Sequence, residues 1–155
     1  MAIVKIHNIK WTLKKALAYI MNPSKTEGQL LVSGYNCDPQ TAYFDFELTN
    51  TMARTIKGDY SKGGCNIAHH IVQSFAPYDK ITPEQAHAIG KEFADRFLQG
   101  RYEYVIATHV DKGHIHNHII FNAVSFYDYK KFRNYKVAAK AREISDRLCV
   151  ENGLY

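Results

Sequence analysis

The sequence predicts an α+β domain in which strands and helices alternate along most of the chain. Short apolar stretches that alternate with polar residues are typical of half-buried strands, and apolar residues three to four positions apart are typical of helices. Towards the C-terminus, the turn-forming run Asp111-Lys112-Gly113 separates two neighbouring strands, which must then pair antiparallel. The expected order of elements is β-α-β-α-β-α-β-β-α, which favours an α+β sandwich.

The first two elements are a strand at residues 2–7 and a helix at residues 11–21. Apolar and polar side chains alternate in the strand. The helix has apolar residues at helical spacing, namely Leu13, Leu17, Ile20 and Met21. A loop at residues 22–28 then leads into a short strand at residues 30–35.

A second helix is expected to run from Pro39 to about Ile56, because Asp38 supplies an N-cap and Pro39 suits the first helical position. The glycine-rich residues 57–64 read as a loop. Residues 67–75 are then expected to form a strand.

The last elements are two helices that flank a hairpin. Thr82-Pro83-Glu84-Gln85 is a capping box with a proline inside it, which predicts a helix to about Leu98. Residues 102–109 and 116–126 are the two strands of the hairpin. A final helix is expected at residues 135–152, where Gly153 ends it.

Length and composition limit the number of domains, the classes of partner and the cellular compartment that we expect. At 155 residues the chain is expected to form one domain, and its net charge of +5 allows a nucleic-acid partner without requiring one. Three widely spaced cysteines imply no disulfide framework and fit a reducing, cytoplasmic compartment. No apolar run is long enough to span a membrane, and the first residues lack the features of a signal peptide.

Four histidines lie within ten positions: His109, His114, His116 and His118. Clustered neutral imidazoles are costly to bury unless something binds them, and a divalent metal is the usual reason. Imidazole nitrogen suits Mn, Zn, Co, Ni or Cu better than Mg. The sequence therefore predicts a metal site with one bound divalent ion.

Strand geometry selects three of the four histidines as ligands. His116 and His118 are two residues apart on one strand, so their side chains point the same way, with Cα atoms roughly 6.7 Å apart. His114 and His118 are roughly 13 Å apart, too far for a compact site. The third ligand should therefore come from His109 across the hairpin. His114 is left as a solvated turn residue or a substrate contact.

A family resemblance rests on the same histidines. The runs His109-Val110-Asp111 and His116-Asn117-His118-Ile119-Ile120-Phe121-Asn122 resemble the three-histidine motif of HUH endonucleases, and more closely that of the P-type mobilisation relaxases. The runs Ala16-Leu17-Ala18-Tyr19-Ile20 and His69–Phe75, followed by Thr82–Gln85, match the family in the same order. The middle position of the motif departs from HUH enzymes broadly, since Asn117 replaces a bulky hydrophobic residue.

The resemblance implies a fold and an activity. It implies a central antiparallel sheet of about five strands with helices packed around it and the metal on one open face. It implies an enzyme that nicks one strand of DNA at a transfer origin, during conjugative mobilisation of a plasmid or an integrative element. Relaxases commonly continue into a further C-terminal region, which leaves open that this chain is the N-terminal part of a longer protein.

The resemblance also implies cofactor and partners. Mg or Mn is the ion expected in the cell, while Zn, Ni or Co could occupy the site elsewhere. The expected partners are single-stranded or hairpin DNA, accessory proteins of a nicking complex and a secretion coupling protein. We expect a monomer in the bacterial cytoplasm, with no membrane partner.

The nucleophile of such an enzyme is a tyrosine, which conserves the phosphodiester energy in a 5'-phosphotyrosine so that the strand can be resealed. Eleven tyrosines compete for this role. The resemblance selects Tyr19, because its N-terminal helix matches the nucleophile segment of the family. Tyr35 and Tyr43 are the alternatives.

Other residues are candidates for supporting roles. Metal-bound histidines generally donate their second nitrogen to another polar group, for which Asp111, Gln73 and His70 are candidates. Asn122 shares a strand face with His116 and could contact ligand or substrate. DNA contacts are expected in the basic and aromatic segment 127–136, from Lys130, Lys131, Arg133, Tyr135 and Lys136.

Three other functions remain open. A rolling-circle replication initiator or a single-tyrosine transposase shares this chemistry, but typically places its tyrosine after the histidines, unlike Tyr19. A non-catalytic DNA-binding module would form no covalent adduct. A three-histidine hydrolase or oxygenase more often includes a carboxylate ligand, and none lies at ligand spacing here.

Overall fold

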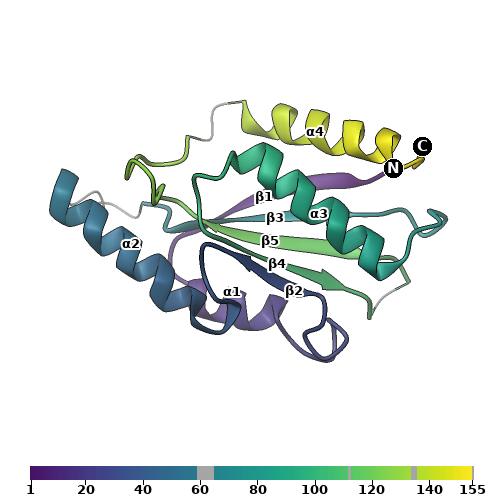
Figure 1. Cartoon of the computed structure of the whole chain (residues 1–155), viewed down its shortest axis with the longest axis horizontal. Helices are drawn as coiled ribbons and strands as arrows, with labels where there is room; N and C mark the ends of the chain where they lie inside the picture. The colour runs from purple at the N-terminus through teal and green to yellow at the C-terminus, as the bar shows by residue number, and fades with distance from the viewer. Residues whose placement is uncertain (59–64, 112, 134–135, 155) are drawn as a thin grey trace.

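The computed structural model describes residues 1–58, 65–111, 113–133 and 136–154. Within these residues, five strands form one antiparallel sheet, and four α-helices pack against it (Figure 1). The expected α+β class, strand number and order of elements are confirmed.

The strands lie side by side in the order β1-β3-β5-β4-β2. Their bounds are β1 (Ile3–Ile9), β2 (Val32–Tyr35), β3 (Ala68–Ser74), β4 (Tyr104–His109) and β5 (His116–Asn122). The helices are α1 (Leu13–Ile20), α2 (Ala42–Lys57), α3 (Pro83–Leu98) and α4 (Val137–Glu151). A short 3-10 helix, Pro39–Thr41, precedes α2.

Two boundaries differ from expectation by more than two residues. Asp38 caps the 3-10 turn by accepting from the amide of Gln40, so the α-helix itself begins four residues later than Asp38, at Ala42. β5 ends at Asn122 rather than at residue 126, because Ser125 leaves the ladder and its hydroxyl accepts from the following backbone amides. The expected loop residues 59–64 and the expected helix start at Tyr135 lie outside the described residues.

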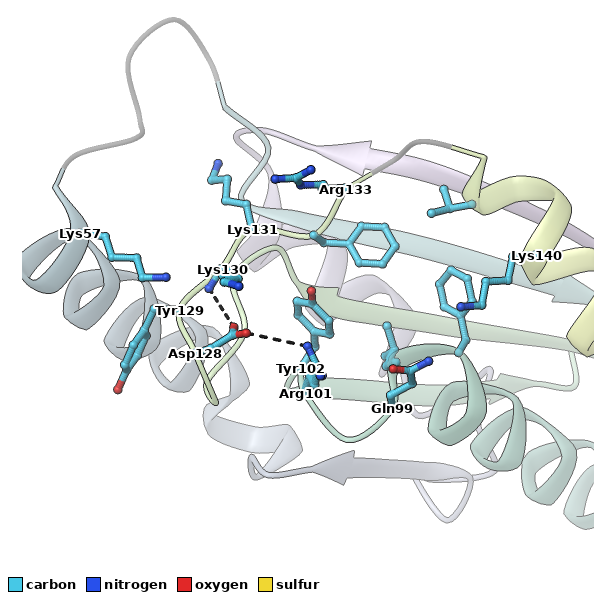
Figure 2. A pocket seen from close by; sticks show the side chains of 14 residues that line it. Lys57, Gln99, Arg101, Tyr102, Asp128, Tyr129, Lys130, Lys131, Arg133 and Lys140 are labelled. Carbon is cyan, nitrogen blue, oxygen red and sulfur yellow. Dashed lines mark hydrogen bonds and ion pairs between the residues drawn. The ribbon is translucent and has the colours of Figure 1, made fainter.

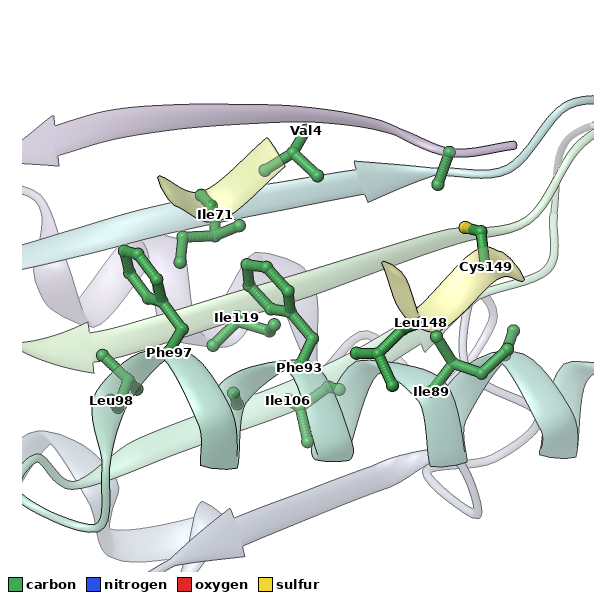
Figure 3. Close-up of a cluster of buried hydrophobic side chains, with 14 of the residues drawn as sticks. Val4, Ile71, Ile89, Phe93, Phe97, Leu98, Ile106, Ile119, Leu148 and Cys149 are labelled. Atoms are coloured by element: carbon green, nitrogen blue, oxygen red, sulfur yellow. The ribbon is translucent and has the colours of Figure 1, made fainter. Parts of the chain in front are cut away.

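The two faces of the sheet are covered differently (Figure 1). Helices α3 and α4 pack on one face, here called the back face, and α1 and α2 pack on the other, the front face. On the back face, Phe93 and Phe97 of α3 pack over Ile71, Ile106 and Ile119 of the central strands (Figure 3). On the front face, α1 and α2 contribute Leu13, Leu17, Ile20 and Phe46 to a smaller core over Val105 and Ile120.

Strand alternation assigns the side chains of β5 to these faces. Ile119 and Phe121 belong to the back core, whereas Ile120 belongs to the front core. His116 and His118 have the parity of Ile120, so they point to the front face, beyond the end of the α1 core.

Helix α3 approaches the sheet closely at Gly90. A Cβ atom added there would lie 2.5 Å from Ile106 Cδ1 and 2.6 Å from Asn117 Nδ2. We expect Gly90→Ala to lower the melting temperature in calorimetry. Helix propensity alone would favour alanine by roughly 0.5–1 kcal/mol, but overpacking a core typically costs about 1–3 kcal/mol.

Ala88→Gly, on the exposed face of the same helix, is the control for helix propensity. It should lower the melting temperature through propensity alone. A raised melting temperature for Gly90→Ala would show that α3 can move away from the sheet at little cost.

The described helices include none that combines the length and the apolar character needed to cross a bilayer.

Candidate active site

The three predicted histidines meet on the front face, at the ends of two neighbouring strands. His109 ends β4 and His116 begins β5, and the two residues are direct partners in the antiparallel register. His118 follows on the same face of β5. The ring centroids of His109 and His118 are 4.1 Å apart, and those of His116 and His118 are 6.2 Å apart.

His109 is held by the end of helix α1. Its Nε2 lies 2.8 Å from the carbonyl oxygen of Ile20, which can only accept, so Nε2 carries the proton and donates. In the neutral form of this ring, the lone pair is then on Nδ1. Ile20 is the last residue of α1, where helix carbonyls lack partners within the helix, so this bond also satisfies the helix end.

Two further histidines contact the cluster. His70 on β3 places Nε2 2.9 Å from Nδ1 of His118. His114 places its Nε2 2.6 Å from Nε2 of His116. Each contact occupies one ring nitrogen of a predicted ligand. The structure therefore brings His70 and His114 together with the predicted triad.

Burial keeps the inner rings neutral. Desolvation lowers the pKa of His118 well below its ordinary value, helped by the neighbouring imidazoles, and desolvation lowers the pKa of His70 to about 4. Neutral imidazole is the form that binds a metal, because its lone pair is available.

The donor set fits a divalent ion. Each of His109, His116 and His118 has one ring nitrogen in contact with an outer group, which is how metal-bound histidines are commonly held. In the described part of the chain, however, no three histidine, cysteine or acidic side chains are already arranged to hold an ion. The imidazoles would have to rotate to converge.

Tyr19 lies beside this cluster. Its ring meets those of His109 and His118 edge-on, with centroid distances of 5.8 Å and 6.3 Å. Leu13, Leu17 and Ile20 are the buried residues of α1, whereas Tyr19 is 51% exposed. The helix therefore packs through its apolar side and presents the phenol beside the histidines.

Lys25 is a site residue that the sequence did not single out. Its Nζ lies 5.6 Å from the centroid of the Tyr19 ring and 2.7 Å from Oδ2 of Asp111. The hydrogen bond to Asp111 raises the pKa of Lys25, so the ammonium stays charged beside Tyr19. Asp111, expected to support a metal-bound histidine, instead pairs with this lysine. Lys25 lies in the loop after α1, and no local pattern could have linked it to Asp111.

The cluster lines a front-face cleft of about 240 Å³. Tyr19, His109, His116 and His118 form part of its wall, and the rest comes from β1 and β3: Ile3, Lys5, His7, Val72 and Ser74. The cleft thus combines imidazoles with a lysine and contains no carboxylate among its described lining residues, an environment suited to an anionic ligand.

Two predicted supporting residues lie elsewhere. Gln73 is fully buried on the back face, where it bonds with Ser145 and Asn117, so it does not reach the histidines. Asn122 shares their face, but lies about 13 Å from His118 along the strand, buried against the carbonyl of Phe46.

The alternative nucleophiles are also remote from the cluster. Tyr35 stacks on Tyr104 at the opposite end of β4, with ring centroids 5.4 Å apart. The hydroxyl of Tyr43 donates to Glu47 on α2. Neither tyrosine lines the histidine cleft.

Three of the expected DNA-contact residues line a second, larger cavity, of about 720 Å³ (Figure 2). Lys130, Lys131 and Arg133 come from the loop after β5, while Lys57 comes from the end of α2 and Lys140 from α4. Arg101, whose guanidinium lies 3.8 Å from Asp128, and the aromatic Tyr102, Tyr129 and Phe132 complete its polar and aromatic wall. Lys136 stands at the N-cap position of α4 and does not line the cavity, and Tyr135 lies outside the described residues.

This basic cavity and the histidine cleft lie at opposite ends of β5. His116 begins the strand and the basic loop follows its last residue, Asn122, so about 20 Å of strand separates them. Their linings share no residue. One short segment of ligand therefore cannot touch both.

Comparison with known proteins identifies the family. A family model of the MobA/VirD2-like relaxase nuclease domain matches residues 19–154. The chain belongs to this relaxase family. Its match to the nuclease domain of relaxases supports an endonuclease-type enzyme. The matched residues include Tyr19 and the histidine cluster.

Similar proteins include two named relatives. The relaxase domain is 39% identical over 153 residues to the group II intron-interrupted relaxase LtrB of Lactococcus lactis subsp. cremoris, covering 87% of this chain and 27% of LtrB. It is 33% identical over 155 residues to a protein rlx of Staphylococcus aureus, covering 99% of this chain and 42% of rlx. The chain thus spans less than half the length of these relatives.

A solved structure supports the fold. It comes from work on the molecular basis of vancomycin resistance transfer in Staphylococcus aureus. It matches with a TM-score of 0.60 at 11% sequence identity, and the match covers 99% of this chain and 95% of that chain.

Proposed function

We propose that this relaxase domain nicks single-stranded DNA at a transfer origin by transesterification, with Tyr19 as the nucleophile. The phenol loses its proton as its oxygen forms a bond to the scissile phosphorus. The bond from phosphorus to the 3' oxygen breaks, that oxygen takes up a proton, and a 5'-phosphotyrosine results. The freed 3' hydroxyl can later attack the same phosphorus and reseal the strand. The observation that carries the proposal is the position of Tyr19 beside His109 and His118 in one cleft.

His109, His116 and His118 would hold one divalent ion. When bound, such an ion supplies positive charge to the scissile phosphate and lowers the cost of the charge that develops there. The three imidazoles add no negative charge of their own, so the cleft keeps its attraction for an anion. We propose Mg or Mn as the ion in the cell.

Lys25 contributes charge on the other side of the phenol. Its ammonium remains protonated because of Asp111, so it cannot serve as the base that removes the phenol proton. A fixed positive charge near the ring instead attracts the scissile phosphate. Asp111 thereby acts on the site through Lys25.

The test of the function is a covalent adduct. The domain is incubated with Mn²⁺ and single-stranded oligonucleotides that carry candidate transfer-origin sequences, and the products are separated under denaturing conditions. The proposal expects the protein joined to the 5' end of the fragment downstream of the cut, and a free 3' hydroxyl on the upstream fragment. Binding without any adduct would favour a non-catalytic DNA-binding module.

We further propose that the basic cavity binds the phosphate backbone of a second segment of the same DNA, either single-stranded or part of a hairpin stem. Lys57, Lys130, Lys131, Arg133 and Lys140 give it several positive charges against one carboxylate, Asp128, among the described lining residues. Accessory proteins of a nicking complex and a secretion coupling protein belong to this proposal as partners of the whole protein.

If the basic cavity binds phosphates, its cations should affect the salt dependence of DNA affinity. Each phosphate contact contributes about 0.7–0.9 to the slope of log affinity against log salt concentration. The double variant Lys130→Gln/Arg133→Gln should therefore bind DNA more weakly, with a slope shallower by about 1.4–1.8. Fluorescence anisotropy over a salt series measures it.

The matched control is Lys91→Gln/Arg147→Gln, which removes two exposed cations from α3 and α4 that do not line the cavity. The control should keep the original slope. Equal changes in both double variants would mean that the cavity has no specific role and that only net charge matters.

A further inference from the structure

A row of buried polar side chains crosses the back of the sheet directly behind the histidines. Thr108 and Asn117 are register partners on β4 and β5, and Asn117 is also the register partner of Gln73 on β3. All three are fully buried on the back face. In the sequence, Thr108 directly precedes His109, and Asn117 lies between His116 and His118.

Hydrogen bonds join the row from strand to strand. The Thr108 hydroxyl donates to Asn117 Oδ1 at 2.6 Å, and Asn117 Nδ2 donates to Gln73 Oε1 at 3.0 Å. Asn117 Nδ2 also donates to the carbonyl of Ala86 in α3, at 2.7 Å. The amide of Asn117 is thus bonded at both ends, and it connects three strands and a helix.

The row extends to helices at both ends. Since the Thr108 proton is used toward Asn117, its oxygen accepts from His87 Nδ1, at 2.8 Å. The other nitrogen of His87 then accepts from the Ser33 hydroxyl, at 2.7 Å. At the far end, Gln73 Nε2 donates to Ser145 on α4, at 2.9 Å.

These hydrogen bonds can form in only one pairing register of strands β3, β5 and β4. If β5 slid by two residues in either direction, its side chains would keep their faces, but Thr108 would face Ile115 or Ile119 instead of Asn117. Gln73 would face the same isoleucines after an equivalent slip between β3 and β5. A buried hydroxyl or amide group without a partner lowers the stability of the fold by more than its hydrogen bond would raise it. The slipped registers are therefore disfavoured.

We propose that Thr108, Asn117 and Gln73 are positioning residues that fix His109 opposite His116 and so set the geometry of the metal ligands. The inference rests on the proposed function, in which these histidines hold the ion. It also accounts for a polar residue at position 117, where HUH enzymes broadly have a hydrophobic one. Gly90 leaves room for it, since a Cβ atom there would meet the Asn117 amide.

The test compares two variants of β4 that each lose one hydroxyl. Thr108→Val breaks the row behind His109. Tyr104 lies four residues before Thr108, on the same face of β4, and Tyr104→Phe breaks a hydrogen bond from its hydroxyl to Asp95. Both should lower the melting temperature by a few degrees, roughly 2–4 °C. Only Thr108→Val should also weaken Mn²⁺ binding, by about tenfold, as is typical when support of a metal ligand is lost.

A metal-free measurement separates this inference from the proposed function. Nitrogen-15 NMR of the histidine side chains should show His109 as a single Nε2–H tautomer in the unmodified protein and in Tyr104→Phe, but as a mixture in Thr108→Val. Thr108→Ser, which keeps the hydroxyl, should restore both the tautomer and the affinity.

Three outcomes decide the question. Unchanged Mn²⁺ affinity and tautomer in Thr108→Val, with lowered stability alone, would overturn the inference. Failure of the unmodified protein to bind Mn²⁺ would count against the proposed function, and the tautomer would still decide the positioning role. If Thr108→Val does not fold, Asn117→Leu breaks the same row with a side chain of similar volume and is judged by the same two readouts.

Discussion

Tyr19→Phe is expected to eliminate both nicking and the covalent protein–DNA adduct. The change removes only the hydroxyl, and the transesterification has no nucleophile without it. The ring, which makes the contacts with His109 and His118, remains in place. The affinities for Mn²⁺ and for single-stranded DNA should therefore stay within about twofold of those of the unmodified protein, as measured by calorimetry and anisotropy.

The controls are Tyr35→Phe and Tyr43→Phe. Both residues lie away from the cleft, so both variants should nick DNA and form the adduct as before. An adduct that persists in Tyr19→Phe would assign the nucleophile to another residue, which peptide mapping of the adduct would identify.

His116→Ala should reduce cleavage by more than about 100-fold. Loss of a group that merely supports a metal ligand typically costs about 10–100-fold, and loss of a ligand itself should cost more. The fold should survive, because His116 is half-buried on an open part of the sheet and leaves no core cavity. The expected loss of unfolding free energy is within about 1 kcal/mol. Cleavage assays, Mn²⁺ titration and chemical denaturation measure the three effects.

His114→Ala is the matched comparison, because the two rings are in contact. As an outer partner of His116, His114 should matter less, with a loss of about 10–100-fold in cleavage. The reverse ranking, with His114→Ala inactive and His116→Ala active, would exchange their roles and refute the assigned triad.

The period of two along a strand accounts for most of what the sequence could predict about the site. It places His116 and His118 on one face, and hairpin pairing brings His109 to them. The same rule exposes an error over Gln73. Gln73 is three residues from His70, so the two side chains must point to opposite faces, and only His70 reaches the cluster.

Other parts of the site depend on contacts that strand patterns do not encode. Asn122 has the right face, but lies too far along the strand to meet the histidines. The pairing of Lys25 with Asp111 joins two loops 86 residues apart in sequence. Strand β5 ends at Asn122, four residues before its predicted end, because the Ser125 side chain forms a local hydrogen bond that competes with strand pairing. Caps and periodicity, in contrast, located all four α-helices.

The hydrogen bond from His109 to the carbonyl of Ile20 couples the docking of helix α1 to the orientation of the His109 ring. Helix α1 has only eight residues, too few to be stable apart from the sheet that it packs against. An interaction that favours this orientation of His109 also favours the docked position of α1. By linkage, an interaction that favours the docked helix favours this orientation of His109 by the same coupling free energy. If His109 holds the ion and Tyr19 is the nucleophile, as proposed, then ion binding would help to keep Tyr19 in place, and the loss of either would loosen the other.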